Sequence, residues 1–215
     1  MNTVKNNIPT ALKEPIYPIV EIFESLQGEG ANTGMSCIFI RFGKCNLACP
    51  WCDTNFNQFE RLPLSRILQK VRSFSAKNII ITGGEPTIQP KLTALLAALK
   101  AEGYFLAIET NGLKNVPPQI DYIAVSPKRA YWEQYRRRHI TAADEVRIVA
   151  DENVVDFCQW VETHIRATNY YLSPCEINGE MNLLDVITQL GLLNTRRDKP
   201  LWRLSLQTHK LIGIE

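Results

Sequence analysis

The feature that most constrains the fold is the alternation of short apolar runs with longer amphipathic runs. Several short runs are apolar almost throughout, which is typical of strands in a parallel sheet that is covered on both faces. The predicted strands span residues 37–42, 78–82, 105–110, 122–126, 145–150, 170–173 and 202–207. The predicted helices span residues 63–74, 90–103, 152–165 and 181–191. This alternation predicts an α/β fold with a mostly parallel sheet or barrel.

The unusual residue clusters all follow the carboxyl ends of predicted strands. They are RFGKC (41–45), GGEP (83–86), TNG (110–112), SPK (126–128), SPCE (173–176) and QTHK (207–210). In barrel-like α/β folds, active sites are built on that face. The sequence therefore predicts an enzyme with one composite site.

Composition sets bounds on the class of protein. The chain has 215 residues with 45% hydrophobic and 21% charged residues, which is ordinary for one globular domain. We predict a flexible lead-in over residues 1–16 and a single domain over residues 17–215. A formal charge of +2 gives no strong attraction to nucleic acid or to a membrane surface. No apolar run has the length of a membrane span or a secretion signal, so we expect a cytoplasmic protein.

Three of the six cysteines lie close together in CNLACPWCDT (45–54). Cys45, Cys49 and Cys52 have the spacing C-x3-C-x2-C on one short loop. In a reducing compartment, such cysteines are thiols or metal ligands rather than disulfides. A four-iron cluster usually takes four cysteines, so three would leave one iron open for another ligand. The alternative is a zinc site whose fourth ligand comes from elsewhere. Its candidates are Cys37, Cys158, Cys175, His139, His164 and His209.

The cysteine spacing, with Trp51 before the third cysteine, resembles the radical S-adenosylmethionine (SAM) superfamily. GGEP is similar to a second landmark of that superfamily, where glycines let a strand end approach SAM; on its own it is also an ordinary strand-to-helix turn. The resemblance implies a partial (β/α) barrel and a [4Fe-4S] cluster on three cysteines. SAM binds the fourth iron, and its cleavage yields a 5′-deoxyadenosyl radical.

Three further stretches carry chemistry of their own. In ESLQGEG (24–30), two glycines flank Glu29 and allow a tight backbone turn around a flat ligand. Arg41 ends a predicted strand, and its planar guanidinium suits a carboxylate partner. Thr54 has a hydroxyl that is able to ligate Mg²⁺, although it also fits a simple loop cap.

With the tail LSLQTHKLIGIE, these stretches resemble the 7-carboxy-7-deazaguanine synthase family from about residue 17 to the end of the chain. The shared motifs are LQGEG, IRFGKCNLACPWCDT, ITGGEPT, ETNG, VSPK and LSLQTHK. The resemblance implies that 6-carboxy-5,6,7,8-tetrahydropterin undergoes a radical ring contraction with loss of ammonia. The product is the deazapurine precursor of queuosine and related compounds. SAM is regenerated and Mg²⁺ is required.

The resemblance also assigns roles to particular residues. Cys45, Cys49 and Cys52 would hold the cluster, and Thr54 would bind Mg²⁺. The predicted SAM contacts are Trp51, Cys52, Asp53, Gly84, Glu85, Ser126, Pro127, Lys128, Ser173, Pro174, Cys175 and Glu176. The predicted substrate contacts are Leu26, Gln27, Gly28, Glu29, Arg41, Thr82, His209 and Glu215, the last through the terminal carboxylate. The sequence departs from the family pattern at LSPC, where a Gln is expected before the Pro. We interpret Cys175 as a small residue near SAM rather than a fourth cluster ligand.

The resemblance also implies a homodimer and an external electron donor such as a flavodoxin. The basic run YRRRHI (135–140) is either a solvated face or a docking patch for that donor. The main alternative function is a radical SAM activase that makes a glycyl radical on a partner protein. A zinc or electron-transfer protein without catalysis would also be compatible with the cysteine loop. The weak net charge disfavours a nucleic-acid-binding module.

Overall fold

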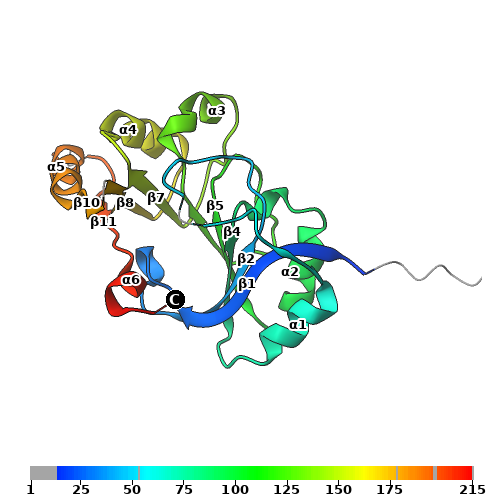
Figure 1. The fold of residues 1–215 in the computed structure, drawn as a ribbon. Coiled ribbons are helices and arrows are strands. Elements are labelled where there is room, and N and C mark those ends of the chain that lie inside the picture. The colour runs from blue at the N-terminus through cyan, green and yellow to red at the C-terminus, as the bar shows by residue number, and fades with distance from the viewer. Residues whose placement is uncertain (1–13, 53, 178, 196–197, 215) are drawn as a thin grey trace, which may run out of the picture.

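The computed structural model describes residues 14–52, 54–177, 179–195 and 198–214 (Figure 1). Its main sheet has nine strands in the order β11-β8-β7-β6-β5-β4-β2-β1-β3. The strands are β1 (Ile16–Leu26), β2 (Ser36–Phe42), β3 (Glu60–Pro63), β4 (Asn78–Gly83), β5 (Phe105–Thr110), β6 (Tyr122–Val125), β7 (Glu145–Ala150), β8 (Asn169–Pro174) and β11 (Trp202–Leu204). A separate hairpin pairs β9 (Glu176–Ile177) with β10 (Glu180–Met181).

Helices connect most of the parallel strands. They are α1 (Leu64–Arg72), α2 (Leu92–Ala101), α3 (Trp132–Arg137), α4 (Val155–His164), α5 (Leu183–Leu193) and α6 (Thr208–Ile212). Three 3-10 turns accompany them: η1 (Gly30–Asn32), η2 (Pro86–Ile88) and η3 (Arg129–Tyr131). Helices α1 to α5 follow the outer side of the curved sheet, whereas α6 lies on the opposite side (Figure 1).

The sheet is mostly parallel and open. Strands β2, β4, β5, β6, β7, β8 and β11 are parallel to one another, whereas β1 runs antiparallel to β2 and β3. Strands β3 and β11 stand at the two ends of the strand order, so the barrel is partial. The predicted α/β class with a partial (β/α) barrel is confirmed.

The two faces of the strands differ in chemistry because side chains alternate along a strand. On β4, Ile79 and Ile81 point outward and are fully buried in the cluster that α1 and α2 cover. On β7, Val146 and Ile148 lie in the corresponding cluster under α4 and α5. The opposite face carries a small cluster of Cys37, Phe39, Ile80 and Ala107 and, toward the strand ends, polar residues that include Arg41 and Glu109. The outer face therefore supplies the core, and the inner face is available for a site.

The structure extends the sequence prediction at the start of the chain. Strand β1 was not predicted, because Pro18 interrupts its pattern and prolines usually exclude a central strand. The register of β1 against β2 shifts between Ile19 and Glu21, and such an irregularity accommodates a proline. Strand β1 begins at Ile16, within the predicted lead-in, and residues 1–13 lie outside the described residues. The division into a lead-in and a single domain stays a prediction.

Other boundaries moved by a few residues. The strand predicted over 202–207 ends at Leu204, after which the chain turns toward the site. Helix α3, with only six residues, was also not predicted. In the described part of the chain, no helix combines the length and apolar character needed to cross a membrane.

The outward face of β4 gives a direct test of this core. Ile81 is fully buried, whereas Ile16 is 55% exposed. Ile81→Ala is expected to lower the free energy of unfolding by ~2–5 kcal/mol, because it removes buried methyl groups and leaves a cavity. The matched Ile16→Ala is expected to change it by about 1 kcal/mol or less. Urea unfolding followed by circular dichroism measures both, and equal losses would contradict this assignment of the core.

Candidate active site

A cavity of about 290 Å³ opens at the carboxyl ends of the parallel strands. That is near the lower limit of small-molecule pockets. Its lining comes from the ends of β1, β2, β4, β5, β7 and β8, the cysteine loop and the segment before α6. The predicted site residues that line it are Leu26, Gln27, Gly28, Glu29, Arg41, Cys45, Cys49, Trp51, Cys52, Thr54, Thr82, Gly84, Ser126, Lys128, Ser173 and His209. The fold thus gathers most of the predicted residues in one place.

The three cysteines of the loop after β2 all reach this cavity. Cys45 and Cys49 are partly buried, and Cys52 is exposed. Burial raises the pKa of the Cys45 thiol, with a smaller opposing effect of the Leu47 backbone N–H. Burial also raises the pKa of Cys49, and the nearby Lys128 partly offsets this. Ligation by iron would require these thiols to lose their protons.

Contacts from four parts of the chain hold the cysteine loop. The Ala48 N–H donates to the Tyr131 hydroxyl (2.9 Å), and Trp51 Nε1 donates to Asp151 Oδ2 (2.8 Å). Asn111 Nδ2 donates to Asn46 Oδ1 (2.8 Å), which ties the loop to the end of β5. The Lys44 backbone N–H donates to the Phe56 carbonyl (2.8 Å). The loop is therefore fixed against η3, the end of β5 and the end of β7.

The donor chemistry of the loop fits an iron–sulfur cluster. Thiolates are the usual ligands of such clusters, and three of them leave one iron for another molecule. Among the described residues, no group of three or more His, Cys, Asp and Glu side chains converges on a single point that would hold one metal ion. The zinc alternative gains no support from this arrangement. A cluster presents its irons at separate corners, so its ligands need not converge in that way.

The two glycines of GGEP have a clear packing role. A Cβ on Gly84 would lie 2.0 Å from the Lys44 carbonyl oxygen. Gly83 has a φ of +122°, and a Cβ there would lie 2.2 Å from the Phe42 carbonyl oxygen. The pair thus permits close approach of β4 to the cysteine loop, where the Glu85 N–H donates to the Lys44 carbonyl (2.9 Å).

Glu85 has a structural role in this loop. Its side chain is 1% exposed. Glu85 Oε1 accepts from Thr87 Oγ1 (2.6 Å) and Thr110 Oγ1 (2.7 Å), and Oε2 accepts from the Asn111 N–H (2.7 Å). This carboxylate joins the end of β4 to the end of β5 and does not reach the cavity.

The predicted SAM residues fall into two groups. Ser126, Lys128 and Ser173 line the cavity, and Ser173 Oγ is buried without a hydrogen-bond partner. Lys128 Nζ donates to Ser126 Oγ (2.6 Å) and lies 5.0 Å from the Trp51 ring centroid. Burial lowers the pKa of Lys128. Within the described residues, those predicted for SAM that stay outside the lining are Glu85, Pro127, Pro174, Cys175 and Glu176. Asp53 lies outside the described residues.

Arg41 already has a partner in the protein. Its Nε donates to Glu21 Oε1 (2.6 Å), its register neighbour on β1. Its Nη1 lies 3.5 Å from Thr54 Oγ1, so the predicted carboxylate clamp and the predicted Mg²⁺ ligand are neighbours. Phe23 and Phe39 stack beside them with ring centroids 4.9 Å apart and form an apolar wall of the cavity. Glu21, Phe23 and Phe39 were not predicted.

The segment before α6 and the first turn of α6 close over the loop after β1. The Gly30 N–H donates to Ser205 Oγ (2.9 Å), and Thr208 Oγ1 donates to the Gly28 carbonyl (2.9 Å). A Cβ on Gly28 would lie 2.0 Å from His209 Nδ1, so this glycine makes room for the histidine ring. His209 thus reaches the cavity beside the predicted substrate loop. The predicted contact of Glu215 lies outside the described residues.

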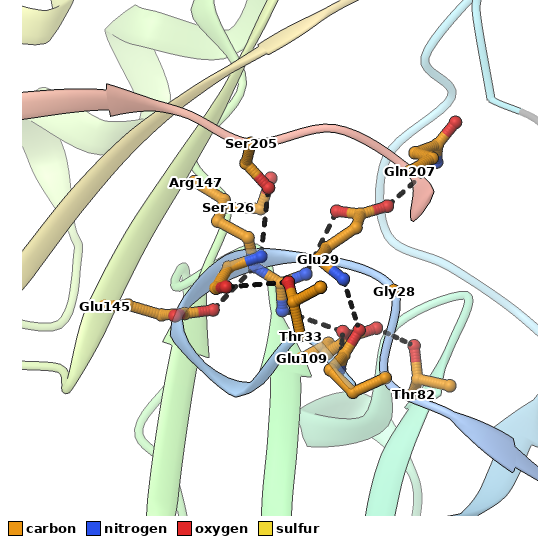
Figure 2. A network of polar contacts seen from close by, with 12 residues as sticks. Gly28, Glu29, Thr33, Thr82, Glu109, Ser126, Glu145, Arg147, Ser205 and Gln207 are labelled. Carbon is orange, nitrogen blue, oxygen red and sulfur yellow. Dashed lines mark hydrogen bonds and ion pairs between the residues drawn. The ribbon is translucent and has the colours of Figure 1, made fainter. Parts of the chain in front are cut away.

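The most highly charged feature of the site was missed by the sequence analysis (Figure 2). Arg147 contacts three carboxylates: Nη1 to Glu29 Oε2 (3.0 Å), Nη2 to Glu109 Oε1 (2.7 Å) and Nε to Glu145 Oε1 (2.8 Å). Burial alone would lower the pKa of Arg147, but these carboxylates raise it. A usable signal was present, because EVRIVA places Glu145 and Arg147 two residues apart, on one face of an apolar strand.

Glu109 connects this group to β4. Its Oε2 accepts from Thr82 Oγ1 (2.7 Å), and its Oε1 also accepts from Gln27 Nε2 (3.1 Å). Burial alone would raise the pKa of Glu109, but Arg147, Thr82 and Gln27 lower it to about 2. The site therefore presents an ionised acceptor at neutral pH, close to three exposed or partly buried thiols and to Arg41.

A partial barrel with three thiols and a polar cavity at its strand ends defines the class of radical SAM enzymes. Residues 39–131 match the family model of the Radical SAM superfamily. Membership implies a [4Fe-4S] cluster and SAM, and the three thiols and Gly84 line the cavity.

Relatives then narrow the class. The chain is 67% identical over 202 residues to the 7-carboxy-7-deazaguanine synthase of Haemophilus influenzae, which covers 94% of this chain and 96% of that protein. It is 60% identical over 209 residues to the synthase of Neisseria meningitidis serogroup B, and the match covers 97% of this chain and 99% of that protein. The crystal structure of QueE from Escherichia coli aligns with a TM-score of 0.67 at 26% identity, over 89% of this chain and 93% of that one. This chain belongs to the 7-carboxy-7-deazaguanine synthase family, and these relatives do not favour the activase alternative.

The contact between Gly84 and the cysteine loop generates a prediction. Gly84→Ala is expected to displace the loop, because its Cβ would meet the Lys44 carbonyl oxygen at 2.0 Å. The variant should therefore hold much less iron and acid-labile sulfide after anaerobic reconstitution. Gly191→Ala is the matched control, since a Cβ at Gly191 in α5 meets nothing within 4 Å. Full iron content in both variants would contradict this role of the glycine.

Proposed function

We propose that this enzyme converts 6-carboxy-5,6,7,8-tetrahydropterin into 7-carboxy-7-deazaguanine and ammonia, in the biosynthesis of queuosine or a related deazapurine. One observation carries the proposal. A single cavity brings the three thiols together with Arg41, Glu29 and Glu109, so a radical source and a polar bicyclic substrate would share one enclosed space. The names of the relatives support the same reaction.

The residues of the cavity have separate tasks in this proposal. Cys45, Cys49 and Cys52 would hold the [4Fe-4S] cluster, and the cluster together with SAM would supply the radical chemistry. Arg41 pairs with the substrate carboxylate through the nitrogens that Glu21 leaves free. Phe23 and Phe39 contact the rings and exclude water. Thr82 and His209 contact the ring region, and the Ser126–Lys128 and Ser173–Glu176 segments contact SAM.

We also propose that Mg²⁺ binds at Thr54. Mg²⁺ keeps several waters and takes few protein ligands, often together with substrate oxygens. Thr54 Oγ1 lies 3.5 Å from Arg41 Nη1, so a bare cation there would face a positive charge. A substrate carboxylate between the two would offset that repulsion. The ion is therefore expected to bind only with the pterin, and calorimetric titration of Mg²⁺ with and without the pterin tests this order.

Three further proposals concern the whole protein. We expect a homodimer, since apolar side chains are exposed along α5 and the chain after it. They are Leu183, Leu184, Ile187, Leu192, Leu201 and Leu204. Sedimentation analysis tests this, and a monomer at micromolar concentration would contradict it.

We propose a single domain over residues 17–215, tested by a single cooperative unfolding transition. We propose a cytoplasmic location, in keeping with six free cysteines, tested by cell fractionation.

We propose that an acidic one-electron carrier such as a flavodoxin docks on η3 and α3. Residues 129–138 contain four Arg and one Glu. The hydroxyl of Tyr131 in η3 accepts a hydrogen bond from the Ala48 N–H of the cysteine loop (2.9 Å), so this basic segment lies next to the predicted cluster. Long-range attraction between opposite charges raises association rates and depends on salt.

Charge reversal tests that docking surface. Arg137→Glu with Arg138→Glu is expected to slow flavodoxin-driven turnover at low salt by about tenfold or more. Dithionite-driven turnover should be unchanged, because dithionite needs no docking surface. Arg61→Glu with Arg66→Glu, on β3 and α1, serves as the control. Equal flavodoxin-driven rates in the docking variant and the control would contradict the proposal.

A direct assay tests the proposed reaction. After anaerobic reconstitution with iron and sulfide, the protein is given SAM, dithionite, Mg²⁺ and the carboxytetrahydropterin. We expect a product lighter by one ammonia in mass spectrometry. Cys45→Ala should abolish it, whereas Cys158→Ala, a buried thiol in α4, should retain it. Formation of 5′-deoxyadenosine without this product would keep the radical chemistry and reject the substrate.

A further inference from the structure

Three carboxylates surround one buried guanidinium in the inner part of the barrel (Figure 2). The Arg147 side chain is 7% exposed and that of Glu145 is 2% exposed, whereas those of Glu29 and Glu109 are 23% and 28% exposed. One positive and three negative side chains give the group a formal charge of −2. A buried pair would need only one carboxylate, so the excess negative charge requires another explanation.

Glu145 anchors the guanidinium from the far side. Its Oε1 accepts from Arg147 Nε, and its Oε2 accepts from the Ala31 N–H (2.8 Å) and from the Tyr122 hydroxyl (3.0 Å). It does not line the main cavity. With Nε held in this way, the two terminal nitrogens of Arg147 point one each at Glu29 and Glu109.

Glu29 and Glu109 are each oriented by a second contact. Glu29 Oε1 accepts from Gln207 Nε2 (2.8 Å), and Glu109 Oε2 accepts from Thr82 Oγ1 (2.7 Å). A carboxylate oxygen has two lone pairs, so Glu29 and Glu109 are each able to accept a further hydrogen bond from a ligand in the cavity that they line. They are acceptors only, so the complementary ligand edge must present hydrogen-bond donors, and the N–H groups of a heterocycle are donors of this kind.

The cavity also has a cationic side. Arg41 is on β2 and Glu109 is on β5, with β4 between them. Two strand spacings amount to about 10 Å. That separation is comparable with the long dimension of a bicyclic ring that carries a carboxylate at one end and an amino group at the other.

We propose that Arg147, anchored by Glu145, is a positioning residue that fixes Glu29 and Glu109 as paired acceptors for the N–H edge of the pterin. That edge comprises the 2-amino group and the adjacent ring N–H. These two parallel N–H donors resemble one edge of a guanidinium group, which suits carboxylate acceptors. The inference rests on the proposed function and deepens it. It makes Arg147 a determinant of selectivity for a 2-amino heterocycle over its 2-oxo analogue.

The test compares two stable probes that differ at this edge. 6-Carboxypterin carries the 2-amino group, and 6-carboxylumazine carries a carbonyl oxygen in its place. Their dissociation constants are measured by fluorescence on the reconstituted enzyme with SAM and without reductant. Wild type is expected to bind the pterin at least about tenfold more tightly, because the lumazine sets a carbonyl oxygen against carboxylates.

Two variants separate positioning from a structural role. Arg147→Lys keeps the charge but replaces the planar fork of three nitrogens by a single ammonium nitrogen, which does not match three carboxylates that each meet a different nitrogen. Glu145→Gln removes the charge of the anchor, and this residue does not line the main cavity. Both should bring the pterin-to-lumazine preference to within about threefold, while the dissociation constant of SAM stays near that of wild type. Arg72→Lys, an exposed arginine paired with Glu102 at 2.6 Å, should keep the wild-type preference.

Each outcome decides between the two ideas. A folded Arg147→Lys variant that binds both probes more weakly but keeps their ratio overturns the inference, and if that variant does not fold, Glu145→Gln decides. Equal binding of both probes by wild type overturns the inference alone, since the turnover assay judges the reaction separately. If wild type binds neither probe and forms no product, the proposed function fails and the inference fails with it.

Discussion

The site is organised around the buried guanidinium of Arg147. Through three carboxylates it joins β7, β5 and the loop after β1, and through Glu29 it reaches Gln207 near the end of the chain. Removal of the arginine would leave several negative charges close together in a poorly solvated space, at a cost of several kcal/mol. The arrangement of the anionic side of the cavity therefore depends on one residue whose own side chain is only 7% exposed.

Side chains alternate along each strand, so the residues that stabilise the fold and the residues that line the cavity lie on opposite faces of the sheet. The outward residues of β2, β4 and β5 are mainly isoleucine and leucine, and they pack against α1 and α2. The inward residues near the strand ends include Arg41, Thr82, Glu109 and Ser173. A substitution on the inner face therefore changes the cavity while it leaves the main clusters in place. Gly84 and Glu85, which follow β4, are neither outward nor inward strand residues. They hold the cysteine loop in place through their close contacts with the Lys44 backbone.

The sequence was sufficient for the parallel part of the fold and for the thiol loop. Apolar runs identify β2, β4 and β5 because burial on the outer face requires them, and the C-x3-C-x2-C spacing is local. The partners of buried charges were not predictable in the same way. Arg41 was expected to pair with a substrate carboxylate, and in the structure its Nε contacts the carboxylate of Glu21. Glu21 lies on β1, a strand that was not predicted because Pro18 interrupts its pattern. Glu109 and Arg147 are 38 residues apart in sequence, and only the order of the strands brings them together.

The contact between the loop after β1 and the segment before α6 has a consequence for synthesis. Gly28 and Thr208 are bonded across 180 positions, and Gly30 and Ser205 across 175. The first strand of the sheet is made early, but its loop meets these partners only after residues 205–208 have been made. A nascent chain can therefore form much of the outer core while its cavity is still open on one side. Completion of the cavity requires residues 205–208, so a chain interrupted before them would not offer a finished site to its reactive cofactors.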